Sequence, residues 1–482
     1  MTTGQFQTSR WKERARLILA GRELPLARIA LVATALLLAL AISLIPPPAG
    51  IPSQAMVALG LIGMTVLLWA TMAIPQPMAA ILFLALITLT GTVAPKAAFS
   101  GFMSSSLWLV FGGLLIGTAA ERTGFGRYVA RRFLGRFHGS YGALVAGILV
   151  GSSVLSFLVP SNMGRLAITV PVVLALAKDA GYAPGSNGHI GLVLMAVVGN
   201  FAVAQGVLPG NLLNIMIVGA GETLYGIHFT YMHYLLLCGP ILGLAKGLLV
   251  WSLVVRLHPA PAPRSHDAGE ELERLSPEAV RVGLFLSAAI VLWATDFWHG
   301  IKPGWVALAA GVLCVLPGIG VLPTREAFNP RRLLIIIWVG TVLSLAGVMA
   351  DSGASTLLSS ALARFAGIEG QSPLYGYFAM AYLSSMLAAL STFGGAIPTM
   401  AAVASEISTA TGLPLDTGIL AIAAGMSALF FPYIAAPIVV GLMMGQVSQR
   451  AALPFTAITA ALTCAIIIPL NAAWWWLIGV LP

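Results

Sequence analysis

The chain has 482 residues, of which 59% are hydrophobic and only 9% charged, and its mean hydropathy is +0.94. This composition excludes an ordinary soluble domain, and its long continuous apolar runs predict an all-α polytopic membrane protein rather than a β-barrel. The formal net charge of +9 does not indicate a nucleic-acid partner, because nearly all basic residues stand in short segments between apolar runs. The three cysteines lie in separate apolar segments, without the spacing of a metal or redox site.

The chain opens with a basic segment, residues 1–27, followed by an apolar stretch that ends near Ile45. A signal peptide is the alternative interpretation, but the basic region is long and "IPPPAG" is a poor small-residue cleavage site. We therefore predict a cytoplasmic N-terminal segment over 1–27. A first transmembrane helix and an external loop follow over 28–55.

Apolar runs that could cross a membrane recur along the whole chain. The predicted spans are 28–45, 56–74, 76–92, 105–121, 188–220, 231–257, 279–298, 303–322, 332–351, 415–440 and 455–480. They predict about 11 transmembrane helices in the inner (plasma) membrane of a bacterial-type cell.

Two further apolar regions, 141–178 and 373–411, are interrupted near their middles by polar and glycine-rich clusters. Each is either two spans or one re-entrant hairpin. Irregular backbone is too costly against lipid, so both breaks must line a cavity enclosed by protein. The polar tips and the repeat described next favour two hairpins.

Charge sets the predicted orientation. With two hairpins and a cytoplasmic N-terminus, twenty Lys and Arg residues fall on cytoplasmic segments and three on external ones. This bias follows the positive-inside rule and places the C-terminus outside. Two full spans in each interrupted region would give the same parity, so charge does not prove the hairpins.

The two halves of the chain resemble each other. "VFGGLLIGTAAERTG" (110–124) parallels "IWVGTVLSLAGVMADSG" (337–353), and each is followed by an amphipathic stretch and then by an interrupted region. Five spans separate equivalent elements, so the repeat is inverted. We predict a 5+5 inverted repeat: 56–257 with the hairpin 141–178, and 281–482 with the hairpin 373–411. A cytoplasmic linker, 258–280, joins them. Such repeats with broken helices are typical of secondary transporters.

The first predicted tip is "VPSNMGR" (159–165), and it contains a full positive charge, Arg165. Carbonyl, Ser and Asn oxygens at such a turn can hold a small cation, and the start of the outgoing helix favours an anion. The functional interpretation of Arg165 is a clamp for a carboxylate or sulfate group. The alternative is an arginine that pairs with hairpin carbonyls or reaches a water-filled vestibule.

The second predicted tip is "LSTFGGAIPT" (390–399). Two other stretches also look broken: 197–214, with several Gly, Pro and Asn residues, and 425–437 at the equivalent place in the second half. Kinked helices packed through small residues are the plain alternative. Four breaks at symmetry-related positions favour one shared cavity.

Isolated polar residues in the apolar runs give weaker signals. Lys246 is expected to extend to the cytoplasmic interface, and Glu406 either faces external water or serves as a proton site. We find no Walker loop, HExxH motif, paired aspartates or serine–lysine arrangement, so an enzyme is not expected.

At this point the sequence resembles the divalent anion/sodium symporter family, within the ion transporter superfamily. The similar segments are "LLWATMAIPQPMAAILFLALITLTG" (67–91), "LWLVFGGLLIGTAAERTGFGRYVARRF" (107–133), the Ser161–Asn162 pair, "LPGNLLNIMIVGAG" (208–221) and "ALFFPYIAAP" (428–437). The resemblance implies eleven spans, two re-entrant hairpins, a homodimer and an elevator mechanism. It also implies sodium ions held at the hairpin tips, and substrates such as succinate, malate, citrate or sulfate.

The chain departs from this family at both tips. Met163 replaces the threonine of the first Ser-Asn-Thr motif, and Arg165 adds a charge that the motif lacks. The second tip keeps neither the asparagine nor the threonine. We interpret the chain as a divergent member with an altered substrate and altered ion coupling. In this hypothesis an arginine offsets substrate charge that a second sodium ion normally neutralises.

The candidate residues follow from the tips, the breaks and the resemblance. The predicted substrate-binding residues are Ser161, Asn162, Met163, Gly164, Arg165, Pro209, Asn211, Thr392, Phe393, Gly394 and Gly395. The predicted sodium-binding residues are Ser161, Asn162, Gly199, Asn200, Ser391 and Thr392.

The sequence therefore predicts an elevator-type secondary transporter that imports a small anion, such as a di- or tricarboxylate or sulfate, coupled to sodium. No organic cofactor is expected. A proton-coupled or exchange-type anion transporter is the first alternative, because the second tip is eroded. A membrane sensor or scaffold that kept the fold and lost transport is a further one.

Overall fold

The computed structural model describes residues 26–134, 137, 139–263, 275–358, 361, 367, 370–390 and 393–482. Every regular element in this part is a helix, which confirms the all-α class there. Most of the predicted N-terminal segment and the middle of the linker lie outside the described residues. The boundaries of the two predicted repeats remain predictions.

The helices of the first half precede the linker. They are α2 (Leu26–Ser43), α3 (Ser53–Thr71), α4 (Gln76–Leu89), α5 (Pro95–Ala98), η1 (Ser100–Met103), α6 (Ser105–Arg122), α7 (Phe125–Leu134), α8 (Tyr141–Leu158), α9 (Asn162–Asp179), α10 (Asn187–Leu194), η2 (Met195–Gly199), α11 (Asn200–Ala204), η3 (Leu208–Gly210), α12 (Leu212–Tyr225), α13 (Tyr231–Cys238), η4 (Gly239–Ala245) and α14 (Lys246–Leu257).

The helices of the second half follow the linker. They are α15 (Pro277–Ala294), α16 (Asp296–His299), α17 (Pro303–Leu313), α18 (Thr324–Ala327), α19 (Pro330–Ser352), α21 (Pro373–Leu390), α22 (Phe393–Ala402), α23 (Ala404–Thr411), α24 (Leu415–Met426), η5 (Pro432–Ile434), α25 (Ala436–Met444), α26 (Gln449–Leu462), η6 (Thr463–Ile467) and α27 (Ile468–Leu477).

Fewer helices are long enough to cross a membrane than the eleven predicted. Within the described residues, eight are long and apolar enough, or nine if a pair bent by 116° between α23 and α24 forms one span. The apolar helices α4, α12 and α17 have only 14, 14 and 11 residues. The number of spans therefore stays a prediction, because length and composition alone do not show which helices cross the membrane.

The first interrupted region is broken where the sequence indicated, and the second contains two described helices on either side of residues outside the described part. In the first, α8 ends at Leu158 and α9 begins at Asn162. In the second, α21 ends at Leu390 and α22 begins at Phe393, while the two residues between them lie outside the described part. Whether each pair of arms is a re-entrant hairpin or two crossings stays a prediction, because helix length alone does not place the arms in a bilayer.

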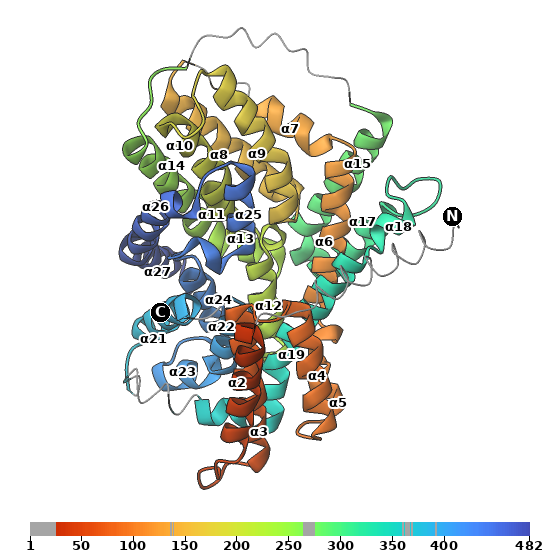
Figure 1. Ribbon diagram of the computed structural model, residues 1–482, viewed down its shortest axis with the longest axis vertical. Coiled ribbons are helices and arrows are strands. Elements are labelled where there is room, and N and C mark those ends of the chain that lie inside the picture. Colours follow the sequence, from red (N-terminus) through yellow and green to blue (C-terminus); the bar gives the residue numbers. More distant parts are fainter. Residues whose placement is uncertain are drawn as a thin grey trace, which may run out of the picture.

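Figure 1 shows how the helices gather. The helices α8, α9, α10 and α14 lie toward one end of the molecule, α2, α3 and α4 lie toward the other, and α12 stands between them. In addition, α12 packs against α6, α19, α22 and α24, so it connects both halves of the chain. The broken elements are thus held in the interior by helices that are distant in sequence.

Close helix packing relies on small residues. A Cβ on Gly112 of α6 would collide with the carbonyl group of Ala307 of α17, and one on Gly425 of α24 would collide with the carbonyl of Ala381 of α21. Small residues let backbones approach closely where apolar burial cannot drive association, as in lipid. These two contacts belong to two of the most extensive helix pairs, α6 with α17 and α21 with α24.

Candidate functional site

The first break is built by a short extended stretch before α9. Val159 and Ser161 have extended backbone angles, and the hydroxyl of Ser161 accepts a hydrogen bond from the backbone N–H of Gly164 at 3.2 Å. A serine in this position caps the first turn of a helix. The tip thus contains the N-terminus of α9, and a helix N-terminus favours negative charge nearby.

Arg165 lies in the first turn of α9, fully buried. Its Nε donates to Oδ1 of Asn200 at 2.8 Å, Nη1 donates to the carbonyl oxygen of Val159 at 2.7 Å, and Nη2 donates to Oδ1 of Asn162. None of the ion pairs among the described residues includes Arg165. The protein therefore holds a guanidinium by uncharged oxygens and leaves its positive charge uncompensated.

These contacts use oxygens that were predicted to bind sodium. The side-chain oxygens of Asn162 and Asn200 accept from Arg165, and that of Ser161 caps α9. Gly199 belongs to the helical segment η2. The residues present at the first predicted sodium site therefore do not fit a sodium ion beside Arg165. Ser391 and Thr392 of the second predicted site lie outside the described residues.

Asparagine side chains extend the site from α9 to α12. Nδ2 of Asn162 donates to Oδ1 of Asn211 at 3.0 Å, and the same oxygen caps α12 by accepting from the N–H of Leu213 at 3.3 Å. Nδ2 of Asn200 and of Asn211 are buried and have no hydrogen-bond partner in the described structure. Unpaired buried donors are costly, so these amides are ready to bind an acceptor.

The remaining predicted residues are divided between two places. Met163 is half exposed, Gly164 is buried behind it, and Pro209 is buried in η3, two residues before the cap of α12. Met163 and Gly164 directly precede Arg165 in α9, and Asn162, Asn200 and Val159, which bond Arg165, form with it the arginine cluster. A narrow pocket next to it is lined by Asn162, Leu166, Val197, Asn200, Phe201, Pro437 and Ile438.

The second tip packs elsewhere. Phe393, Gly394 and Gly395 are buried, and a Cβ on Gly394 would lie 3.4 Å from the rings of Trp69 of α3 and Trp338 of α19. The extensive contacts of α22 are with α12, α19, α21 and α24, whereas those of α9 include α7, α10 and α25. The structure thus brings the first tip together with the broken stretches 197–214 and 425–437, and places the start of α22 against α3 and α19.

One polar centre was misjudged from the sequence. Lys246 is 3% exposed, so the expectation that it extends to the cytoplasmic interface is wrong. Its Nζ donates to Oε1 of Gln205 at 2.8 Å and to the carbonyl oxygen of Ser427. A lysine inside an apolar run was the available signal, but its partners lie 41 and 181 residues away in sequence.

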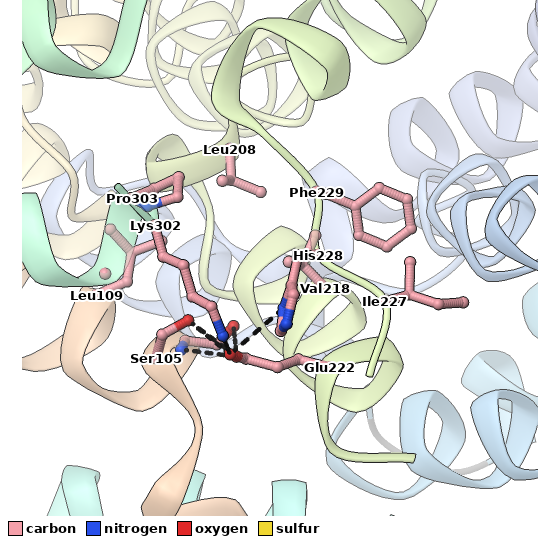
Figure 2. A pocket seen from close by; sticks show the side chains of 12 residues that line it. Ser105, Leu109, Leu208, Val218, Glu222, Ile227, His228, Phe229, Lys302 and Pro303 are labelled. Carbon is pink, nitrogen blue, oxygen red and sulfur yellow. Dashed lines mark hydrogen bonds and ion pairs between the residues drawn. The ribbon is translucent and has the colours of Figure 1, made fainter. Parts of the chain in front are cut away.

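A second polar centre was missed entirely. Figure 2 shows Glu222 of α12 facing Ser105 and Lys302 in a small pocket. Its carboxylate accepts from the hydroxyls of Ser104 at 2.7 Å and Ser105 at 2.9 Å, and from Nζ of Lys302 at 2.8 Å. Nδ1 of His228 lies 3.7 Å away. The cluster ties α12 to the start of α6 and to the residue before α17.

Glu406, a predicted proton site, is partly buried in α23 and accepts a hydrogen bond from the hydroxyl of Ser405 at 2.8 Å. This contact decides neither of its two predicted roles. Glu406 lies in the second interrupted region. It is distant from Arg165 in sequence, and its helix α23 packs against other helices than α9 does.

Comparison with known proteins identifies the family. The family described as "Sodium:sulfate symporter transmembrane region" matches residues 26–481. The chain belongs to this family. It is therefore a transporter and not an enzyme, and the resemblance found in the sequence is confirmed.

Relatives of this family member are distant. They include a "Membrane protein" of Cupriavidus necator (26% identity; 66% of this chain and 66% of the relative), the "Putative malate transporter YflS" of Bacillus subtilis (25%; 52% and 54%) and the "L-tartrate/succinate antiporter" of Escherichia coli K12 (24%; 70% and 72%). The chain thus spans between half and three quarters of the length of these relatives.

The fold of this sodium:sulfate symporter family member is also found in a solved structure. The crystal structure of the Alcanivorax borkumensis YdaH transporter superimposes with a TM-score of 0.56 at 14% identity, over 82% of this chain and 90% of that one. At this identity the likeness shows the fold alone. It is the fold of a multi-pass helical transporter.

Proposed function

We propose that the chain carries a small dicarboxylate-like anion across the membrane by exchange, and that Arg165 takes the place of the first sodium ion. The observation that carries this proposal is the set of bonds from the guanidinium to Val159, Asn162 and Asn200. A fixed cation on those oxygens removes the need for a mobile one. Sodium symport, the sequence prediction, is the competing outcome.

The guanidinium still has donors for a substrate. An arginine has five N–H groups in a planar fork, which suits carboxylate and sulfate groups, and three of them make the bonds described. The unpaired amides of Asn200 and Asn211 and the N-termini of α9 and α12 add further donors. Because Arg165 is fully buried, an anion reaches it only after the first tip moves away from the broken stretches 197–214 and 425–437.

The relatives support the class of substrate. The Bacillus relative is named for malate and the Escherichia relative for exchange of tartrate and succinate. These three anions have two carboxylates on a short chain. We infer that the substrate here is of this class, with sulfate as the other divalent anion to compare.

We also propose the finer architecture that the sequence predicted: an inverted repeat with two re-entrant hairpins, an N-terminus in the cytoplasm and a homodimer that works as an elevator. Matching local structure supports the repeat. Extended backbone at Val207 and Phe431 precedes the short 3₁₀ segments η3 and η5, and extended caps at Asn211 and Ala435 precede α12 and α25. A π-helical segment interrupts each closing helix, as η4 and η6.

The test is exchange in proteoliposomes made with the full chain. Vesicles loaded with unlabelled succinate, malate, tartrate or sulfate are diluted into labelled succinate, in sodium chloride or in choline chloride. We expect labelled succinate to accumulate only in vesicles loaded with a divalent anion, and equally in both salts. Accumulation into empty vesicles that requires sodium would replace exchange by sodium symport, and no movement of any anion would refute the transport proposal.

A further inference from the structure

A second buried cation, Lys246, bonds the broken stretch 425–437. Lys246 starts α14 directly after the π-helical segment η4, and its ammonium bonds the carbonyl oxygen of Ser427, the C-cap residue just after α24. Carbonyls at the C-terminal end of a broken helix carry partial negative charge, and in transporters they coordinate coupling cations. The ammonium therefore stands where a mobile cation would be stabilised.

The surroundings hold this ammonium without neutralising it. Oε1 of Gln205 accepts from it at 2.8 Å, and Nε2 of Gln205 donates to the carbonyl oxygen of Met426 at 3.4 Å. The side chain of Gln205 is thereby fixed between Lys246 and the last residue of α24. Among the described residues that are buried, Asp296 is the one carboxylate, and it accepts from the backbone N–H of Tyr231 rather than from a lysine.

The two buried cations have the same kind of partner. Arg165 bonds the carbonyl of Val159, the C-cap of α8, and Lys246 bonds the carbonyl of Ser427, the C-cap of α24. Phe201 of α11 lines both the pocket beside the first cation and a small cavity beside the second. That second cavity is also lined by Thr456 and Thr459.

We propose that Lys246 is a second fixed cation, and that together with Arg165 it makes the carrier selective for anions of charge −2. The inference rests on the proposed exchange function and extends it to the charge of the substrate. A bound dianion matches the two fixed charges, so the loaded protein is electrically neutral at its centre. The unloaded protein keeps two uncompensated charges, which are costly to move through a membrane.

A purely structural role for Lys246 makes a different prediction. If the ammonium only joins Gln205 to Ser427, its charge has no effect on which anion is preferred. The charge is tested with two anions of similar shape: succinate, and succinamate, in which an amide replaces one carboxylate. Each competes against labelled succinate during exchange in proteoliposomes, and the ratio of their inhibition constants measures the preference for the second charge.

We expect the wild-type chain to prefer succinate, and Lys246→Gln to reduce that preference by about tenfold or more, since one unit charge in a buried site has an effect of at least this size. Lys246→Arg should keep the preference. Lys178→Gln, which removes an exposed lysine at the end of α9, is the matched control and should change nothing.

Gln205→Glu provides a second test of the role of Lys246, for the case in which Lys246→Gln does not fold. It retains the size of the side chain and the hydrogen bond to the ammonium while cancelling its charge, so the preference for succinate should fall as in Lys246→Gln. An unchanged preference in either variant, with wild-type exchange intact, would overturn the role of Lys246 alone. A wild-type chain that neither exchanges nor binds any divalent anion would overturn both proposals.

Discussion

Replacing Arg165 by alanine tests the anion site most directly. The side chain is fully buried, so its charge acts at an effective dielectric of about 20 or lower, and a carboxylate about 4 Å away interacts with it by roughly 4 kcal/mol. This energy corresponds to about a thousandfold in affinity. We expect Arg165→Ala to lose about this factor in succinate binding, measured by calorimetry or by thermal shift on the purified chain.

Arg165→Lys is the matched control for charge without the planar fork. It keeps a cation but cannot bond Val159, Asn162 and Asn200 at once in the same geometry, so we expect a loss between that of alanine and none. Succinate affinity in Arg165→Ala within about tenfold of the wild type would refute the assignment of the arginine to the anion.

The same alanine variant tests whether the guanidinium replaces sodium. Its removal frees the oxygens of Val159, Asn162 and Asn200, which are the kinds of ligand that hold sodium at a broken helix. Sodium should then stabilise Arg165→Ala, by about 2.7 kcal/mol at a hundredfold excess over its Kd, relative to choline. The wild type should show no such difference at this site, and an equal response of both proteins to sodium would count against the replacement.

Three further variants test the surroundings. Asn200→Asp places a carboxylate on the guanidinium of Arg165, so we expect loss of succinate binding in calorimetry, whereas retained binding would contradict the need for an uncompensated charge. Glu222→Gln removes the partner of Lys302, whose side chain is one-third exposed. The free energy of unfolding should therefore fall by only about 1 kcal/mol, and by less at high salt. A loss that does not depend on salt would contradict an ion-pair effect. Gly112→Leu forces a side chain into the backbone of α17 and should destabilise the protein by about 3 kcal/mol or more in thermal or denaturant unfolding, while full stability would show that α6 and α17 can separate freely.

The positions of the breaks could be predicted because the residues that cause them act locally. Pro160 cannot donate a backbone hydrogen bond and Ser161 caps the next helix, so the interruption at 159–161 follows from neighbours in sequence. The lengths of the helices could not be predicted equally well. After Leu313, for example, apolar residues continue to Leu322 although α17 has already ended, because hydropathy does not record where the backbone turns.

The partners of the charged residues could not be predicted because they depend on contacts between distant elements. Asn200 was assigned to sodium from the family resemblance, but only the packing of α9 against α11 brings its oxygen to Arg165. Lys246 looked like an interfacial lysine because one charge near the middle of a long apolar run is usually tolerated by extending to water. The carbonyl that retains it lies in the other half of the chain.

Fixed cations place a demand on the transport cycle that mobile ions do not. A symporter that releases sodium with its substrate returns empty and nearly uncharged, but a carrier with Arg165 and Lys246 keeps both charges when it is empty. Moving two elementary charges against a membrane potential of 100 mV costs about 4.6 kcal/mol, or a factor of roughly two thousand in rate. Return with a second dianion bound avoids this cost. The proposed pair of fixed cations therefore predicts that exchange is faster than return of the empty carrier, on electrostatic grounds and without any gate that recognises the empty state.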